Sequence, residues 1–287
     1  MLGRRPCRRM LQLFPCCFND LQLRTQTLCD MDATRRAAER ERPIMVVETN
    51  LMLPDGGLVV FVDDTGHEAL VPGQPVYGLG GCAMMSEHLD AIIRHPWQEV
   101  RRKVTGSSDA PLHANEFSRS AKREDIEAVA SFFCKQPFAR LGAIITINTQ
   151  LAPELGPVPT IAKVLQRRIM EIARFTRFKE LHVIFESSQR ADPLIQEAMQ
   201  GFDLEETGIS IPTEYYFMPK SAGEPALEVA DFIMHAVGRQ ARHNISQRGG
   251  LLPDFQAVFH SVDRKLVSFM EVGNVAITPT LIGAAPA

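Results

Sequence analysis

Short apolar runs alternate with longer amphipathic stretches from residue 44 onward. Runs such as LVVFV and HVIF are rich in β-branched residues and favour buried strands. Between the runs, apolar residues recur at helical spacing, as in Ile161, Leu165 and Ile169. This alternation predicts a single α/β domain with a mixed sheet and flanking helices. Ser118 is the expected N-cap of one helix, and Pro225 suits the first turn of another. The predicted strands span residues 58–63, 76–84, 140–148, 181–186 and 209–217, and the predicted helices span 86–104, 119–135, 159–178, 191–200 and 224–243.

The composition is that of an ordinary globular protein. Of the 287 residues, 45% are hydrophobic and 23% are charged. The net charge of -3 argues against a surface that is basic throughout, so any contact with nucleic acid has to come from a local patch. No apolar run approaches the roughly 18 residues that a membrane-spanning helix needs. With no convincing secretory signal and few cysteines outside the N-terminal segment, the expected location is the cytoplasm.

The first 44 residues differ from the rest of the chain. They contain nine arginines, no lysine and five acidic residues, with little apolar periodicity. We interpret them as a disordered tail or as a misassigned start, with Met31 or Met45 as the first residue. An Arg-rich presequence is the alternative, against which Asp20 and Asp30 count. Residues 45–287 are the predicted domain, with a core over 57–243 and an extension over 244–287 whose role the sequence leaves open.

Four acidic residues stand where they could share one site. Asp63 ends the apolar run LVVFV, and Glu186 ends the run LHVIF. The carboxyl ends of neighbouring parallel strands converge on one crevice, so these two meet if their strands are adjacent. Glu116 lies at the mouth of a helix, and Asp231 lies in a helix that is apolar on most of its circumference. Carboxylates this close repel one another unless a cation neutralises them.

An all-oxygen set of carboxylates is the environment that Mg²⁺ or Mn²⁺ prefers. A pair of such ions supports in-line attack of water on a phosphodiester. Glu228, Asp231 and His235 stand three and four residues apart, so one side of the last helix can present two acids and an imidazole to the same site. The spacing predicts a cation site in the crevice.

Structural roles compete with this hypothesis at every position. Asp63 and Asp64 suit a turn, and Glu116 suits a helix N-terminus. Glu186 has Arg190 as an available salt-bridge partner, and Asp231 has Arg239 or Arg242. His113 and His235 are more often ordinary hydrogen-bonded residues than ligands or proton carriers. The sequence contains neither GxSxG nor GxxxxGK[ST], which excludes the corresponding hydrolase and nucleotide-binding motifs.

The ordered segments VFVDDTG, LHANEF, HVIFESS and ALEVADFIMHAV resemble a family of bacterial and phage proteins with a "DESG" signature. That family carries a domain-of-unknown-function label and is considered ribonuclease H-like. The resemblance covers about residues 57–243. It implies a ribonuclease H-like fold with Asp63, Glu116, Glu186 and Asp231 as its acidic set. The chain departs from the family in reading DDTG for DESG and in carrying Glu186 where Asp is expected.

The leading hypothesis is a metal-dependent nuclease that acts on DNA or RNA. In it, Asp63 bridges the Mg²⁺ or Mn²⁺ ions, while His235 or Lys220 assists proton transfer or contacts the phosphate. One alternative is a non-catalytic ribonuclease H-like binding module in a mobile-element or defence context. Another is a hydrolase of a small phosphorylated molecule. The oligomeric state is left open. Candidate contacts for a nucleic-acid backbone are Arg94, Arg101, Arg102, Lys103, Arg119, Lys122 and Arg123, which also suit a solvated helix face.

Overall fold

The chain divides into two compact units, Met1–Pro43 and Ile44–Ala287. All described residues belong to the second unit, so the predicted tail over residues 1–44 lies outside them. The structure is a computed structural model that describes residues 45–46, 51–149, 151, 156–174, 176–188, 190–199, 204–206, 209–246, 250–259, 267–272 and 278–280.

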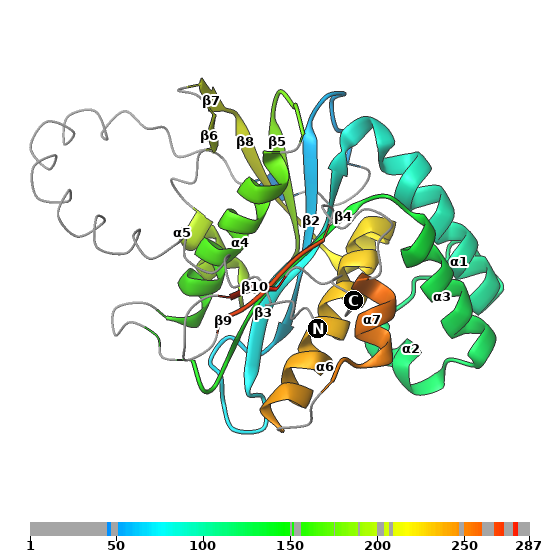
Figure 1. Ribbon diagram of the computed structural model, residues 1–287. Coiled ribbons are helices and arrows are strands. Elements are labelled where there is room, and N and C mark those ends of the chain that lie inside the picture. Colours follow the sequence, from blue (N-terminus) through cyan, green and yellow to red (C-terminus); the bar gives the residue numbers. More distant parts are fainter. Residues whose placement is uncertain are drawn as a thin grey trace, which may run out of the picture. The chain divides into compact units, whose positions relative to one another are not determined.

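A mixed sheet of eight strands forms the centre of the second unit (Figure 1). Its order is β1-β8-β5-β2-β3-β4-β9-β10. Strands β2, β3 and β4 form an antiparallel meander, whereas β5 and β8 continue the sheet on the other side of β2 in parallel. The predicted α/β class with a mixed sheet is therefore confirmed. The strands of the sheet are β1 (Met45–Val46), β2 (Leu58–Gly66), β3 (Val76–Met85), β4 (Ala139–Thr146), β5 (Leu181–Glu186), β8 (Thr213–Met218), β9 (Val267–Val272) and β10 (Thr278–Thr280), and a separate hairpin pairs β6 (Leu204–Glu206) with β7 (Ile209–Ile211).

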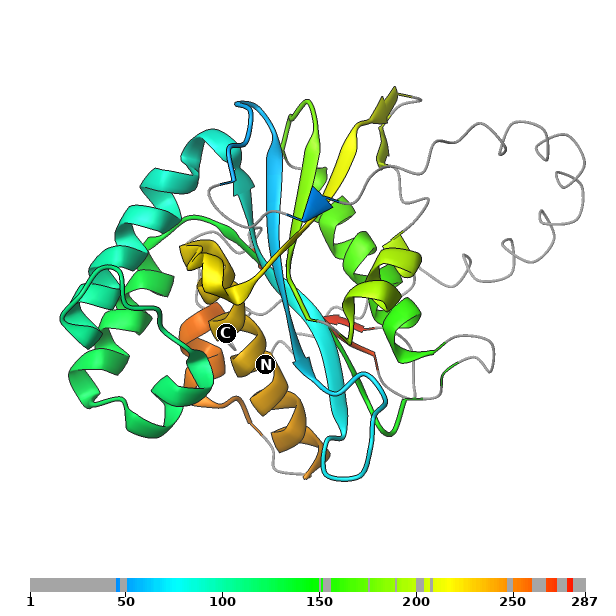
Figure 2. The ribbon, with the colours of Figure 1, turned by 180° about the vertical axis from the view of Figure 1, so that it is seen from behind.

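Helices cover both faces of this sheet (Figures 1 and 2). Helices α4 and α5 pack against one face, and α1, α3, α6 and α7 pack against the other. Because side chains alternate along a strand, β2 contributes to both layers: Val60 and Val62 face α4, while Val59 and Phe61 face α6. The helices are α1 (His95–Thr105), α2 (Ala114–Ser120), α3 (Arg123–Lys135), α4 (Pro157–Ala173), α5 (Asp192–Met199), α6 (Pro225–Ile245) and α7 (Pro253–Phe259), with shorter helical turns at η2 (Ser86–His88), η3 (Asp90–Arg94) and η4 (Lys220–Ala222).

The predicted elements differ from the observed ones in a few places. Ser118 caps no helix: it lies inside α2, and its hydroxyl donates to the Asn115 carbonyl. Helix α3 begins later, where the Asp125 carboxylate accepts the backbone N–H of Lys122 at 2.9 Å. The predicted strand over 209–217 is divided at Pro212, which has no N–H to donate. The extension over 244–287 contributes α7, β9 and β10.

Helix α6 lies unusually close to the sheet because strand β3 carries glycines beneath it. A Cβ atom at Gly81 would lie 2.0 Å from the carbonyl oxygen of Phe61 and 2.8 Å from the Cβ of Ala230. A Cβ atom at Gly80 would lie 2.7 Å from the sulfur of Met234. The sequence GLGG, which weakens β3 as a strand, thus allows α6 to settle on it. Asp231 follows Ala230 directly, so this contact brings it to the sheet.

Replacing Gly81 with alanine is expected to destabilise the protein by about 2 to 3 kcal/mol, because an added methyl group has to push β2 or α6 away. The free energy of unfolding in urea measures the effect. Gly156→Ala is the matched control, since a Cβ there would meet only Pro159 Cδ at an ordinary 3.8 Å. Equal stability of the two variants would contradict the close packing of α6 on β3.

Candidate functional site

Asp63 and Glu186 lie on neighbouring parallel strands: Glu186 is the last residue of β5, whereas β2 continues past Asp63 to Gly66 instead of ending at Asp63 as predicted. The last register pair between β2 and β5 is Val62 with Phe185, and the two acids are the next residues on each strand. Both follow the alternation that places Phe61 and Ile184 on the α6 side of the sheet. The adjacency required by the sequence hypothesis is therefore present.

The two acids share this end of the sheet with Asp231 of α6. Asp63 is only 8% exposed. Burial raises its pKa well above the ordinary value, and the charges of Glu186, Asp231 and Asp64 raise it further. Burial also raises the pKa of Glu186, to which Asp231 and Asp64 add, while Lys220 acts in the opposite direction. Asp63, Glu186 and Asp231 are thus close enough to repel one another.

Lys220 places a positive charge at this end of the sheet. Its Nζ lies 3.2 Å from Oε1 of Glu186. Burial alone would lower its pKa, but Glu186, Asp231 and Asp63 together raise it. Lys220 lies in η4, directly after β8, and its side chain is about half exposed. The ammonium therefore offsets part of the negative charge that the three carboxylates concentrate.

Two of the three arginines weighed as salt-bridge partners for Glu186 and Asp231 have other acidic neighbours. Arg190 Nε lies 3.9 Å from Glu68, and Arg239 lies 2.9 Å from Asp254. Asp231 instead accepts the backbone N–H of Ala114 at 3.0 Å. The segment LHANEF is thereby attached to α6 through the same carboxylate that faces Asp63.

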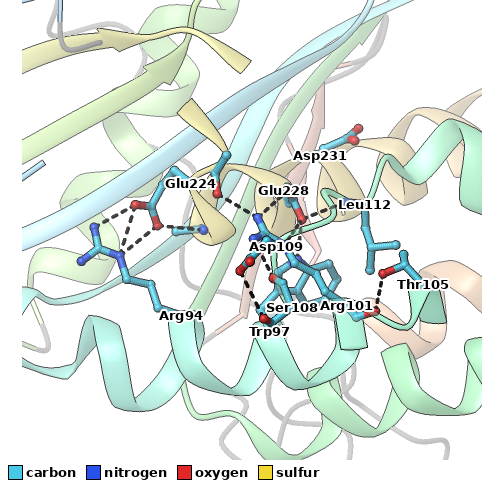
Figure 3. A network of polar contacts seen from close by, with 12 residues as sticks. Arg94, Trp97, Arg101, Thr105, Ser108, Asp109, Leu112, Glu224, Glu228 and Asp231 are labelled. Atoms are coloured by element: carbon cyan, nitrogen blue, oxygen red, sulfur yellow. Dashed lines mark hydrogen bonds and ion pairs between the residues drawn. The ribbon is translucent and has the colours of Figure 1, made fainter. Parts of the chain in front are cut away.

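Glu228, one turn before Asp231, has a different role from the one its spacing suggests (Figure 3). Its carboxylate accepts hydrogen bonds from Arg101 at 2.6 Å, from the Trp97 indole at 2.8 Å and from the Leu112 backbone at 3.1 Å. Arg101 and Glu228 are 4% and 6% exposed. The hypothesis that Glu228 joins Asp231 in the cation site is therefore wrong, because this carboxylate already forms a buried ion pair.

The same contacts remove two of the candidate nucleic-acid contacts. Arg101 is buried against Glu228, and Arg94 forms an ion pair with Glu224 at 2.8 Å. Glu224 also caps α6 by accepting the N–H of Ala226. Arg94 and Arg101 consequently hold α1 and η3 against the start of α6, and neither is available for a phosphate backbone in this arrangement.

The structure does not bring Glu116 or His235 into contact with Asp63 and Glu186. Glu116 is exposed in the first turn of α2. His235 lines a separate cleft with a volume of about 340 Å³, formed by residues of α2, α3, α6 and α7. Burial lowers the pKa of His235, against an opposing effect of Asp231. Its Nε2 is buried without a hydrogen-bond partner in the described part of the chain.

His113 lies beside the acids instead. It lines a small pocket, with a volume of about 10 Å³, together with Glu186, Lys220 and Asp231. Sequence reasoning treated this histidine as an ordinary hydrogen-bonded residue. Its place directly before the helix that carries Glu116 was the available signal, but only the contacts with α6 select it.

The donor set fits a hard divalent cation in its chemistry. Asp63, Glu186 and Asp231 provide oxygen ligands. The ammonium of Lys220 already forms an ion pair with Glu186. As they stand, no three or more His, Cys, Asp and Glu side chains of the described residues are arranged to hold a metal ion. Loading the site therefore requires these side chains to converge and Lys220 to release Glu186.

Comparison with protein-family models and with curated proteins identifies no relative of the chain. No protein-family model matches the chain, and no curated protein matches it. Within the described residues, no helix is both long and apolar enough to cross a membrane. Function therefore has to be inferred from the geometry and charge of the site itself.

Replacing Asp63 with asparagine is expected to stabilise the metal-free protein at neutral pH. A folded-state pKa above the unfolded value makes the wild type most stable below about pH 4, and this stability is lost as pH rises through the raised pKa. The asparagine variant has no such loss. Its advantage should be near zero below about pH 4 and should grow toward pH 7.

Urea unfolding in EDTA across this pH range measures the difference. Asp55→Asn is the control, because Asp55 is an exposed aspartate in a turn. An Asp63 variant that is less stable than the wild type at pH 7 would contradict the repulsion inferred among the three carboxylates.

Proposed function

We propose that this chain is a ribonuclease H-like, metal-dependent nuclease that hydrolyses phosphodiester bonds of DNA or RNA. The observation that carries the proposal is the meeting of Asp63, Glu186 and Asp231 at one end of the sheet, where burial raises the pKa of Asp63 and the charges of the other two acids raise it further. Burying a carboxylate beside two others is unfavourable unless a cation accompanies them. A divalent ion supplies that compensation and the chemistry for phosphodiester hydrolysis.

The fold supports this reading. The first long strand, β2, is central, has an antiparallel meander on one side and parallel strands on the other, and carries Asp63. Glu186 ends the next parallel strand, and Asp231 lies on the helix that crosses the meander. An acid on the first strand, one on a later strand and one on the last helix is the order expected for a ribonuclease H-like domain, and here the helix with the third acid is α6, which α7 follows. Fold analogy raises the expectation without assigning a reaction.

Each side chain then has a role. Asp63, Glu186 and Asp231 would hold one or two Mg²⁺ or Mn²⁺ ions, with Asp63 in the middle of the set. The chemistry supplied by the bound ions is activation of water and neutralisation of charge on the phosphate. Lys220, whose ammonium lies beside Glu186, would contact a phosphate oxygen of the substrate. Glu116 remains a predicted ligand without a contact to the other three.

Cleavage assays on the full chain test the proposal. Labelled single-stranded and double-stranded DNA, RNA and an RNA–DNA hybrid are incubated with Mg²⁺, Mn²⁺ or EDTA. The proposal expects cutting of at least one substrate with a divalent ion and none with EDTA. No cutting of any substrate, together with no binding of either ion in calorimetry, would overturn it.

A second candidate is a non-catalytic ribonuclease H-like module that binds a partner in a mobile-element or defence context. The ion pair between Lys220 and Glu186 favours it, because the crevice is then partly neutralised without a metal. The two candidates differ in a single result. The module would leave every nucleic-acid substrate intact, because it uses the acidic crevice for a structural ion or a protein partner.

A further inference from the structure

The cleft that His235 lines is a separate cavity from the acidic end of the sheet. It lies among α2, α3, α6 and α7, which share one side of the sheet (Figure 1), and its volume is about 340 Å³. Ala114 and Phe232 line it, whereas the residues before them, His113 and Asp231, line the small pocket beside Glu186. The acids of the proposed cation site do not line the cleft, so their chemistry does not account for it.

Apolar side chains form most of the lining of this cleft. Phe117, Phe133 and Phe232 supply aromatic surface. Ile126 lines the cleft from α3 with 54% of its surface exposed. An apolar cavity that stays empty is unfavourable, and water finds few partners in it. Each of the four helices contributes an alanine whose short side chain leaves the space open, namely Ala114, Ala130, Ala236 and Ala257.

The polar side chains of the lining either have partners or carry no charge. The hydroxyl of Ser118 donates to the Asn115 carbonyl at 2.9 Å, and Arg239 forms an ion pair with Asp254 at 2.9 Å. Burial lowers the pKa of His235, which keeps its imidazole neutral near neutral pH. The described lining therefore offers no unpaired charge, and an ion that entered the cleft would lose water without gaining a counter-charge.

We propose that this cleft binds an uncharged aromatic molecule of about eleven non-hydrogen atoms. The size follows from the volume, because one such atom takes roughly the 30 Å³ that a water molecule occupies in the liquid. Cavities of about 300 Å³ and more that are lined by apolar and aromatic side chains are typical of small-molecule sites. The ring of the ligand packs against the three phenylalanines and covers the exposed side chain of Ile126.

Calorimetric titration of the full chain near neutral pH tests the proposal. The probe is 4-tert-butylphenol, an uncharged aromatic molecule of the required size, and 4-tert-butylbenzoate is its anionic counterpart. The phenol should bind with a dissociation constant of about 1 mM or lower. The benzoate should bind at least about tenfold more weakly, because it brings a charge into the cleft.

Trp97 provides a second signal for binding. It is the only tryptophan of the chain, and its ring centroid lies 5.1 Å from that of Phe232 and 6.3 Å from that of Phe133. Both phenylalanines line the cleft. The fluorescence of Trp97 should therefore change as the phenol binds, with the same concentration dependence as the heat.

Three variants locate the bound phenol. Ala257→Leu fills the cleft from α7 and should abolish binding. Ala198→Leu, at an equally half-buried alanine of α5 on the other face of the sheet, is the matched control and should bind as the wild type does. Ile126→Ala changes an exposed side chain, so it should preserve the fold while weakening binding by about three- to tenfold.

The outcomes that contradict the proposal are specific. A wild type that does not bind the phenol, or that binds the benzoate equally well, would overturn it. Binding that Ala257→Leu and Ile126→Ala both leave unchanged would place the phenol elsewhere and overturn it too. A wild type that dimerises in sedimentation, with Ala257→Leu monomeric, would assign the cleft to a second copy of the chain. Circular dichroism confirms the fold of each variant, and because no cleavage is measured, failure here leaves the proposed nuclease function untouched.

Discussion

Asp63→Asn is expected to lower the rate of phosphodiester cleavage by about a thousandfold or more, equivalent to about 4 kcal/mol of transition-state stabilisation. Asparagine keeps the size of the side chain but removes the charge that a divalent cation requires. Asp231→Asn should have an effect of the same order, because both carboxylates act on one site. Since the two losses come from one unit, the double variant should be little worse than either single variant.

Single-turnover cleavage rates in Mn²⁺ measure this prediction, and Asp55→Asn is the matched control. The same Asp63 substitution should make the metal-free protein more stable, so loss of activity and gain of stability are expected in one variant. An Asp63 variant that retains more than about a tenth of the wild-type rate would remove Asp63 from the cation site.

Glu228→Ala is expected to destabilise the protein by about 3 to 5 kcal/mol, because it leaves Arg101 buried without its counter-charge. The Trp97 indole and the Leu112 N–H lose their acceptor in the same variant. Since these contacts join α1 and the segment before α2 to α6, partial unfolding should begin there. Equilibrium unfolding in urea gives the magnitude, and hydrogen exchange of α1 gives the location.

Two further variants separate this ion pair from surface charge. Glu99→Ala breaks the exposed pair with Arg102, in which both side chains are more than half exposed, and should cost at most about 1 kcal/mol. The double variant Arg101→Met with Glu228→Leu should recover part of the stability, because an apolar pair leaves no buried charge unpaired, while the Trp97 indole and the Leu112 N–H still lack an acceptor. A Glu228→Ala variant as stable as Glu99→Ala would show that the buried network contributes little.

Local patterns predicted the parts of this fold that depend on neighbours in the chain. The apolar run before Asp63 and the run before Glu186 each form a strand, and the rule for parallel strands brings their ends together. The apolar circumference of α6 correctly indicated that this helix packs against the sheet. The glycines of β3, which lowered its apparent strand propensity, are explained only by the helix that lies over them.

The sequence predicted the wrong surroundings for residues whose contacts come from distant parts of the chain. Glu228 and Asp231 are equivalent by helical spacing, yet Arg101 and Trp97, more than a hundred residues away, occupy Glu228 alone. Glu116 lies in a helix that sequence patterns did not separate from the next one, and the observed α2 leaves it exposed. No periodicity in the sequence distinguishes His113 from His235. His113 lies near the acids because the backbone N–H groups on either side of it donate hydrogen bonds to side chains of α6.

The central claim is that Asp63, Glu186 and Asp231 together hold a divalent cation. Anomalous X-ray diffraction from crystals of the full chain soaked in Mn²⁺ tests it most directly, because the signal locates the ion independently of activity. The account predicts a peak within coordination distance of Asp63 and at least one of the other two carboxylates, with Lys220 displaced from Glu186. Crystals that bind Mn²⁺ elsewhere, or bind none while the Lys220–Glu186 pair stays intact, would contradict it.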